Sequence, residues 1–180
     1  MSVLDARDNE ARSYLEFVDV LRQHGAAPKE EMRALWRRIV FSILISNTDD
    51  HLRNHGVLWA GTAGWRLSPA YDLNPVRLDL KPRVLTTAID LDDGTASLKL
   101  ALRVAGYFEL GEDEAHKIAG QVGVAVATWR REAKKLGIAP AEIDLMASAF
   151  EHEDLRAARS LASPLRATKQ MMRSTADRSP

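Results

Sequence analysis

The chain has 180 residues, with 25 basic and 25 acidic side chains and a formal net charge of zero, which argues against direct nucleic acid binding. Its 46% of hydrophobic residues excludes a largely disordered chain, and the absence of cysteine excludes disulfides and thiolate metal sites. No apolar run approaches the roughly 20 residues of a membrane span and the start lacks a signal-peptide pattern, so we expect a soluble cytoplasmic protein.

Two helices open the predicted fold. Apolar side chains recur at helical spacing over residues 9–24, and Gly25 supplies a stop signal. Pro28 suits the first turn of a second helix, which becomes apolar on nearly every face over residues 39–45. Because a helix that is apolar all round is buried, we expect its end to lie deep in the core and to lead into the polar turn 46–50.

A β-hairpin is expected next. Residues 56–59 and 65–67 have the pattern of two short strands around the glycine-containing turn 61–64. The two ends of a hairpin lie close together, so groups just before it can meet groups just after it. Three prolines make the following stretch irregular, with one further short strand expected over residues 84–89.

Three more helices complete the prediction, over residues 97–108, 111–136 and 140–150. The expected fold class is therefore mainly α with a small β-hairpin. We expect one domain over residues 1–162. Residues 163–180 carry four basic residues and one acidic residue, a net charge of +3, and are predicted to form a disordered basic tail.

Oxygen-bearing side chains flank the predicted hairpin: Asp49 and Asn54 precede it, and Asp72 follows it. Kinase-type phosphotransfer uses such a set, in which one Asp accepts the proton of the incoming hydroxyl while an Asn and a second Asp hold the magnesium that bridges the phosphates. We therefore predict Asp49 as the base and Asn54 and Asp72 as magnesium ligands. The alternative is that all three are ordinary turn and loop residues.

Two other metal motifs are rejected. His51 and His55 have the spacing of a zinc pair, but the glutamate of the zincin order is absent between them. Residues 90–94 resemble the start of a calcium loop, but the glycine comes one position early and Ala101 stands where a glutamate would close the loop. His51 is better interpreted as a loop-ordering group, and Arg53 is expected to face phosphate.

Two segments carry a family pattern, N-x-D-x-H-x-x-N over residues 47–54 and L-x-P-x-Y-D over residues 67–72. In order and spacing they resemble the HipA family of bacterial serine/threonine kinases, the toxins of HipBA-type toxin–antitoxin modules. The resemblance covers about residues 8–160. It implies Mg²⁺ and ATP as cofactors, Asp49 as catalytic base, and Asn54 and Asp72 as magnesium ligands. The residues that would line the nucleotide phosphates are His51, Arg53, Asn54, Tyr71 and Asp72.

The family fold is kinase-like with two lobes, and this chain resembles the helical C-terminal lobe, because no Gly-rich loop followed by a strand lysine precedes Asp49. Members phosphorylate a protein hydroxyl, with aminoacyl-tRNA synthetases among the substrates, and a small DNA-binding antitoxin restrains them. The expected partners are thus a protein substrate, an antitoxin or a separate N-terminal lobe chain, and a second copy in a homo-oligomer. The alternative is a catalytically inactive remnant that acts as a partner-binding module.

Overall fold

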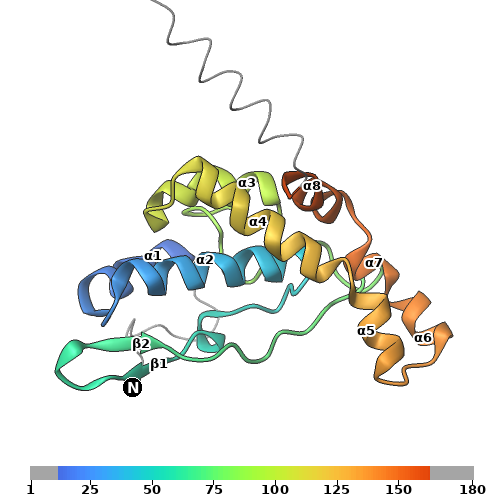
Figure 1. The fold of residues 1–180 in the computed structure, drawn as a ribbon, viewed down its shortest axis with the longest axis horizontal. Coiled ribbons are helices and arrows are strands. Elements are labelled where there is room, and N and C mark those ends of the chain that lie inside the picture. Colours follow the sequence, from blue (N-terminus) through green and yellow to red (C-terminus); the bar gives the residue numbers. More distant parts are fainter. Residues whose placement is uncertain (1–11, 163–180) are drawn as a thin grey trace, which may run out of the picture.

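The computed structural model describes residues 12–162 as a mainly helical fold with one β-hairpin, as the sequence predicted (Figure 1). The elements are α1 (Tyr14–His24), α2 (Pro28–Leu44), β1 (Val57–Trp59), β2 (Trp65–Leu67), α3 (Leu98–Val104), α4 (Glu112–Val126), α5 (Trp129–Lys135), α6 (Pro140–Leu145), α7 (Ala147–Phe150) and α8 (Glu153–Leu161). The predicted tail 163–180 lies outside the described residues.

The helix α2 runs through the centre of the molecule. In Figure 1, α3, α4 and α8 lie above it, the hairpin β1–β2 lies below it, and α5 and α6 extend away at the lower right. Both sides of α2 are thereby covered, as expected for a helix that is apolar on nearly every face over its last residues, from residue 39 onward. Within residues 12–162, no helix combines the length and the apolar character needed to cross a lipid bilayer.

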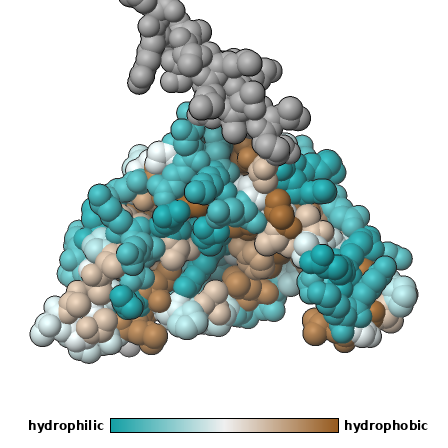
Figure 2. All heavy atoms as spheres, viewed as in Figure 1, coloured by the Kyte–Doolittle hydropathy of each residue, from teal (hydrophilic) through white to brown (hydrophobic). Residues whose placement is uncertain are grey.

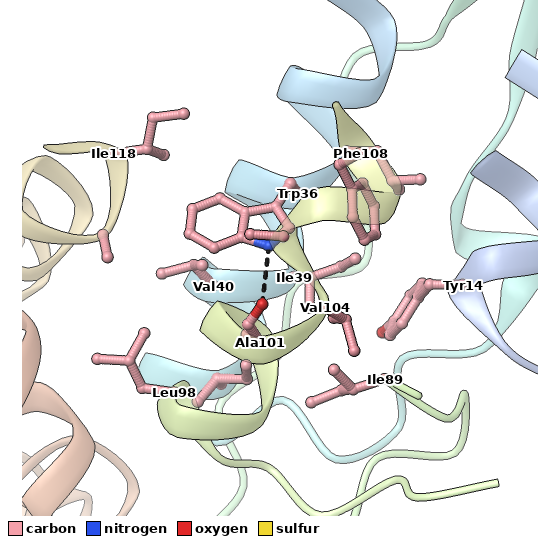
Figure 3. Packing of buried hydrophobic residues seen from close by; sticks show 14 of the residues in the cluster. Tyr14, Trp36, Ile39, Val40, Ile89, Leu98, Ala101, Val104, Phe108 and Ile118 are labelled. Atoms are coloured by element: carbon pink, nitrogen blue, oxygen red, sulfur yellow. Dashed lines mark hydrogen bonds between the residues drawn. The ribbon is translucent and has the colours of Figure 1, made fainter. Parts of the chain in front are cut away.

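The core is built around α2. Trp36 is fully buried and its indole Nε1 donates a hydrogen bond to the backbone oxygen of Ala101 in α3, at 3.2 Å (Figure 3). The C-terminal half of α2 is buried from Ile39 to Leu44 except for Phe41, which packs partly exposed against the same cluster. The prediction of a deeply buried helix end is confirmed.

The first helix begins later than the sequence pattern predicts. The expected start was residue 9, but residues 12 and 13 are not helical and α1 starts at Tyr14. Ser13 and Glu16 form a reciprocal capping box, in which each side chain accepts a hydrogen bond from the other end of the first turn. The S-x-x-E spacing was the sequence signal for this start.

The hairpin lies against the turn between α1 and α2. Its two strands are antiparallel and three residues long, and the backbone N–H of Ala26 donates to the oxygen of Trp65 at 2.7 Å. Gly64 has a φ of +112°, and a Cβ there would lie 2.5 Å from the backbone oxygen of His24. Glycine is therefore required where the hairpin touches the end of α1.

The prediction of a short strand over residues 84–89 is wrong. Val84 and Ala88 form only isolated bridges, to Thr95 and Ser13. The N–H groups between them go to separate loops instead, so no neighbouring strand runs alongside for more than one residue. A sequence rich in β-formers gives no strand when tertiary structure offers it no continuous partner.

The single helix expected over residues 111–136 is divided into α4 and α5. The Thr128 hydroxyl donates back to the Ala125 oxygen at 2.8 Å, a bond that competes with the helical pattern. Trp129, which was predicted to belong to the apolar stripe of a single long helix, instead stacks on Phe150, with ring centroids 4.4 Å apart. The two residues between the helices thus redirect α5 away from the core.

The C-terminal part also departs from the prediction. The helix expected over 140–150 divides into α6 and α7, and α8 was not predicted. Of the residues of α8 only Asp154, Leu155 and Ala158 are buried, so the apolar stripe that could have predicted this short helix is narrow. It packs closely on α4, where Gly120 and Gly123 leave room for its backbone.

Candidate functional site

The polar loop after α2 is held from two sides. Its first residue after the helix cap, Ser46, has a φ of +53°, and its backbone oxygen accepts a hydrogen bond from the N–H of Val76 at 3.1 Å. The backbone oxygen of Thr48 accepts from both the N–H and the hydroxyl of Thr86, at 3.1 and 3.0 Å. Two segments far along the chain thus fix the loop that carries the predicted base.

Asp49 and Asn54 lie at opposite ends of a short turn within this loop. Asp49 is exposed, whereas Asn54 is buried at the end of the 3₁₀-helix η1 (Leu52–Asn54). The Asn54 side-chain Nδ2 donates to the backbone oxygen of Asp49 at 3.4 Å. The Oδ1 atom, which is the only atom of this amide that can bind a cation, takes no part in that bond.

Asp72 reaches the same loop through Asn74. The Asn74 Nδ2 donates to Oδ1 of Asp72 at 2.7 Å, and the Asn74 backbone N–H lies 3.4 Å from Oδ1 of Asn47. Asp72 has a φ of +55°, a left-handed conformation that Asp tolerates better than most residues and that is often retained at functional sites. The exposed Asp72 is thereby linked to a point two residues before Asp49.

The other predicted phosphate-lining residues occupy the same region. The Tyr71 hydroxyl donates to the backbone oxygen of Arg53 at 2.5 Å, so the loop after β2 contacts η1 before β1. Arg53 is exposed and His51 is half-buried, with its Nδ1 atom buried and without a hydrogen-bond partner. The hairpin therefore does bring the two predicted segments together, as its topology implied.

The donor set fits a hard cation. The Asn54 carbonyl and the Asp72 carboxylate are oxygen ligands, which Mg²⁺ prefers, and two protein oxygens leave room for water and phosphate. Within residues 12–162 no group of three or more His, Asp or Glu side chains has an arrangement suited to a metal. A tight all-protein metal cage is thus absent from the described part, and Asn54 and Asp72 present only two of the oxygen ligands that such a cation would need.

Two cavities in the described part of the chain lie away from the candidate site. One, of about 680 Å³, is lined by α3, the start of α4 and the loop that contains Asp93 and Ser97. The other, of about 720 Å³, lies along α5. The part of the site near Asp49 is open surface, with Asp49, Arg53, Tyr71 and Asp72 all exposed.

One residue of the site that was not predicted from the sequence is Asp50, the neighbour of the predicted base. It is fully buried, and its carboxylate contacts Tyr14 of α1, Ser42 of α2 and His55 after η1. Ser42 was the available signal, because a lone polar residue in a buried apolar run needs a hydrogen-bond partner. Asp50 is therefore part of the core, although the residue before it faces solvent.

Burial alone would raise the pKa of Asp50, but the hydrogen bond and charge of His55 and the hydrogen bonds from Tyr14 and Ser42 outweigh it, so the pKa lies below its usual value. Burial, followed by the charge and hydrogen bond of Asp50, raises the pKa of Tyr14 well above 10. Asp50 is thus ionised and Tyr14 neutral at pH 7.

Arg38 of α2 was also missed. Its guanidinium donates to the backbone oxygen of Ser68, in the segment that leads to Asp72. Burial lowers the pKa of Arg38, opposed by the charges of Asp50, Glu31 and Tyr71. Glu31 in turn accepts a hydrogen bond from the N–H of Leu67 at 2.9 Å. Two side chains of α2 therefore hold the end of β2 and the start of the Asp72 loop.

Similarity to known proteins is found at three levels: a family, a named relative and a solved structure. The family described as HipA-like C-terminal domain matches residues 1–130. A Haemophilus influenzae protein named "Putative kinase" is 33% identical over 66 residues, which cover 36% of this chain and 19% of that protein. A solved structure of the Shewanella oneidensis MR-1 toxin–antitoxin system, HipA and HipB with operator DNA, matches with a TM-score of 0.60 and 18% identity, over 87% of this chain and 37% of that chain.

The chain spans about a fifth of the length of the named relative and less than two fifths of the matched structure. The structural likeness shows that the fold is that of the matched region, and the family match covers well over half of the sequence. By this match, the chain belongs to the HipA-like C-terminal domain family.

Proposed function

We propose that this chain is the C-terminal catalytic lobe of a HipA-like serine/threonine protein kinase, which transfers the γ-phosphate of ATP to a protein hydroxyl as the toxin of a toxin–antitoxin system. The observation that carries the proposal is the hydrogen-bonded link from Asp72 through Asn74 to the loop that holds Asp49 and Asn54. The relative named as a kinase and the HipA–HipB–DNA structure support it, the latter in favour of an antitoxin as partner.

Each residue has a distinct task in this proposal. The exposed Asp49 carboxylate accepts the proton of the substrate hydroxyl and orients it. Asn54 and Asp72 would supply oxygen ligands to the metal, and His51, Arg53 and Tyr71 would line the phosphates. Bound Mg²⁺ would supply positive charge that neutralises the nucleotide phosphates. Because this chemistry depends mainly on positioning, the lobe alone should turn over little, since half of the nucleotide clamp belongs to the N-terminal lobe.

Thermal unfolding with Mg²⁺ and a non-hydrolysable ATP analogue tests the site. A ligand at ten times its Kd stabilises the folded state by about 1.4 kcal/mol, which raises the melting temperature of a chain of this size by roughly 3 °C. Asp72→Asn, which keeps the left-handed backbone and the shape of the side chain, should abolish the rise. Asp79→Asn is the matched control, because Asp79 is an exposed carboxylate of the same connecting segment and pairs with Arg77.

A phosphotransfer assay with labelled ATP completes the test. We expect little turnover by the chain alone, and turnover that Asp49→Asn abolishes once an N-terminal lobe is supplied. Robust activity of the isolated chain would show that the second lobe is dispensable. No thermal shift in wild type at millimolar nucleotide and Mg²⁺ would favour the second candidate function, a partner-binding module. The observation that supports this candidate is the exposure of the apolar hairpin residues Leu58 and Trp59.

A further inference from the structure

Asp50 is the point where three parts of the lobe meet the candidate loop. Its Oδ2 atom accepts hydrogen bonds from the Tyr14 hydroxyl at 2.6 Å and from the Ser42 hydroxyl at 3.0 Å. Its Oδ1 atom lies 3.0 Å from Nε2 of His55. Its backbone oxygen accepts the N–H of Thr87 at 3.2 Å. Asp50 thus joins α1, α2 and the segment around Thr87 to the loop, and through His55 it also bonds to the far end of that loop.

The Asp50–His55 contact also closes the loop on itself. The two residues are five apart and enclose η1, while Asn54 bonds back to the oxygen of Asp49 on the outer side. The His55 ring is itself fixed, edge-on to Tyr14 with centroids 5.5 Å apart and tilted against Phe17. The loop is therefore closed on its buried side by the Asp50–His55 contact, while Asp49 and Arg53 are exposed on its other side.

A buried carboxylate is costly unless its oxygens are fully bonded. Asp50 meets this condition, with three donors on its two oxygens and with the charge of Arg38 nearby. Removal of the carboxylate would leave those donors without a partner, a larger loss than the bonds alone. Asp50 has no exposed surface and cannot touch a substrate, so any effect on the site passes through the loop.

We propose that Asp50 is a positioning residue, whose carboxylate clamps residues 47–55 to α1 and α2 and thereby places the Asp49 carboxylate and the Asn54 amide. This inference rests on the proposed function of those two groups. It means that the loop is organised by the helical lobe itself, before any second lobe is added, and that Tyr14, the first residue of α1, is part of the support of the site.

The test compares Asp50→Ala with the conservative Asp50→Asn in the full chain. Hydrogen exchange of the amides of residues 47–55 should accelerate about tenfold in Asp50→Ala beyond the change in the rest of the molecule. The Kd of the Mg²⁺ complex of a non-hydrolysable ATP analogue should rise by about tenfold, the lower end of what outer supports of metal ligands contribute. Asp50→Asn keeps one side-chain oxygen and the shape of the side chain, so its loop exchange rates and its Kd should both lie close to those of wild type.

The matched control is Trp36→Phe, which removes another buried polar contact of α2, the bond to Ala101, away from the loop. It should lower stability and leave loop exchange and ligand affinity unchanged. If Asp50→Ala does not fold, His55→Phe replaces it, because a phenyl ring keeps the aromatic contacts and removes only the bond to Asp50.

Exchange and binding separate the two hypotheses. Faster exchange confined to residues 47–55 supports positioning even if wild type binds no nucleotide, and in that case only the proposed function fails. A loop that exchanges like the rest of the molecule in Asp50→Ala or His55→Phe, with ligand affinity equal to that of Trp36→Phe, overturns the positioning role.

Discussion

Adjacent carboxylates of this protein have opposite environments. Asp49 is exposed at the candidate site, whereas Asp50 is buried and bonded to three side chains. The backbone turns sharply between the end of α2 and η1, so neighbouring side chains point to opposite sides of the loop. One carboxylate is thereby available for chemistry, and the next one holds the loop that presents it.

His152, at the start of α8, is a second buried polar residue with a measurable consequence. Its Nε2 donates to the backbone oxygen of Leu44 at 3.1 Å, next to the candidate loop, and its Nδ1 is buried without a hydrogen-bond partner. Burial, together with the positive charge of Arg83 and against the negative charge of Asp154, lowers its pKa to about 4. His152 is therefore neutral in the folded protein at pH 7.

This pKa predicts a loss of stability in mild acid. The unfolded imidazole has a pKa of about 6.5, so the unfolded state takes up the proton first. The contribution of neutral His152 is complete above pH 6.5 and is lost as the pH falls towards 4. Between pH 7 and pH 5 the free energy of unfolding should fall by roughly 1 kcal/mol, allowing for solvent screening. Urea unfolding at both pH values measures it.

The variant His152→Gln keeps a donor for Leu44 but cannot be protonated. It should flatten the dependence between pH 7 and pH 5, while the same change at His24, an exposed residue in the last turn of α1, should leave it as in wild type. An unaltered pH dependence in His152→Gln would assign the acid sensitivity to other groups.

At the scale of elements, the close approach of α4 and α8 depends on two glycines. A Cβ on Gly123 would lie 2.7 Å from the Ala158 Cβ and 2.9 Å from its carbonyl carbon, and one on Gly120 would lie 2.8 Å from the Ala162 backbone nitrogen. Contacts with backbone atoms cannot be relieved by a change of rotamer. These glycines thus cost helix propensity in α4 and permit the contact with α8.

Gly123→Ala should therefore destabilise the fold, although alanine favours a helix. We expect overpacking of about 1–3 kcal/mol to exceed the gain in propensity of about 1 kcal/mol, with a lower melting temperature. Gly106→Ala is the control, because a Cβ there meets nothing within 4 Å. A Gly123→Ala variant as stable as wild type would show that α8 can move away from α4 at no cost.

At the scale of the whole molecule, the exposed apolar side chains of residues 12–162 include one group on the hairpin and one around α5 and α6. On the hairpin, beside the candidate site, Leu58 is 56% and Trp59 63% exposed. At the lower right of Figure 2 apolar residues appear over α5 and α6, where Leu136 is 81% exposed. Exposed apolar groups that gather on one element often mark an interface, and the hairpin adjoins the loops where a second lobe would contribute to a nucleotide site.

We predict that the purified chain self-associates through the hairpin. The double change Leu58→Ser and Trp59→Ser should shift the association to higher concentration, whereas Leu136→Ser should not. Sedimentation equilibrium over a hundredfold range, roughly from micromolar upward, measures this, since association follows mass action. Strictly monomeric wild type across that range would contradict the prediction and leave the hairpin as ordinary surface.

Much of the architecture was predictable because it depends on local signals. Helical spacing predicted α1 and the buried end of α2, and a glycine-containing turn between two short runs predicted the hairpin. The order and spacing of Asp49, Asn54 and Asp72 defined the candidate site and the family resemblance. The roles of these three residues stay predictions, and their loops are joined by the hydrogen bonds through Asn74.

The features that depend on contacts between distant residues were decided by the tertiary structure alone. Residues 84–89 have strand-forming side chains, yet their six N–H groups bond to the backbone oxygens of six different residues and no strand forms. The helix predicted over residues 111–136 is interrupted at Thr128, and the close contact of α8 with α4 depends on Gly120 and Gly123. Asp50 is indistinguishable from Asp49 by residue type. Which of the two is buried was settled only when α1, α2 and His55 packed around one carboxylate.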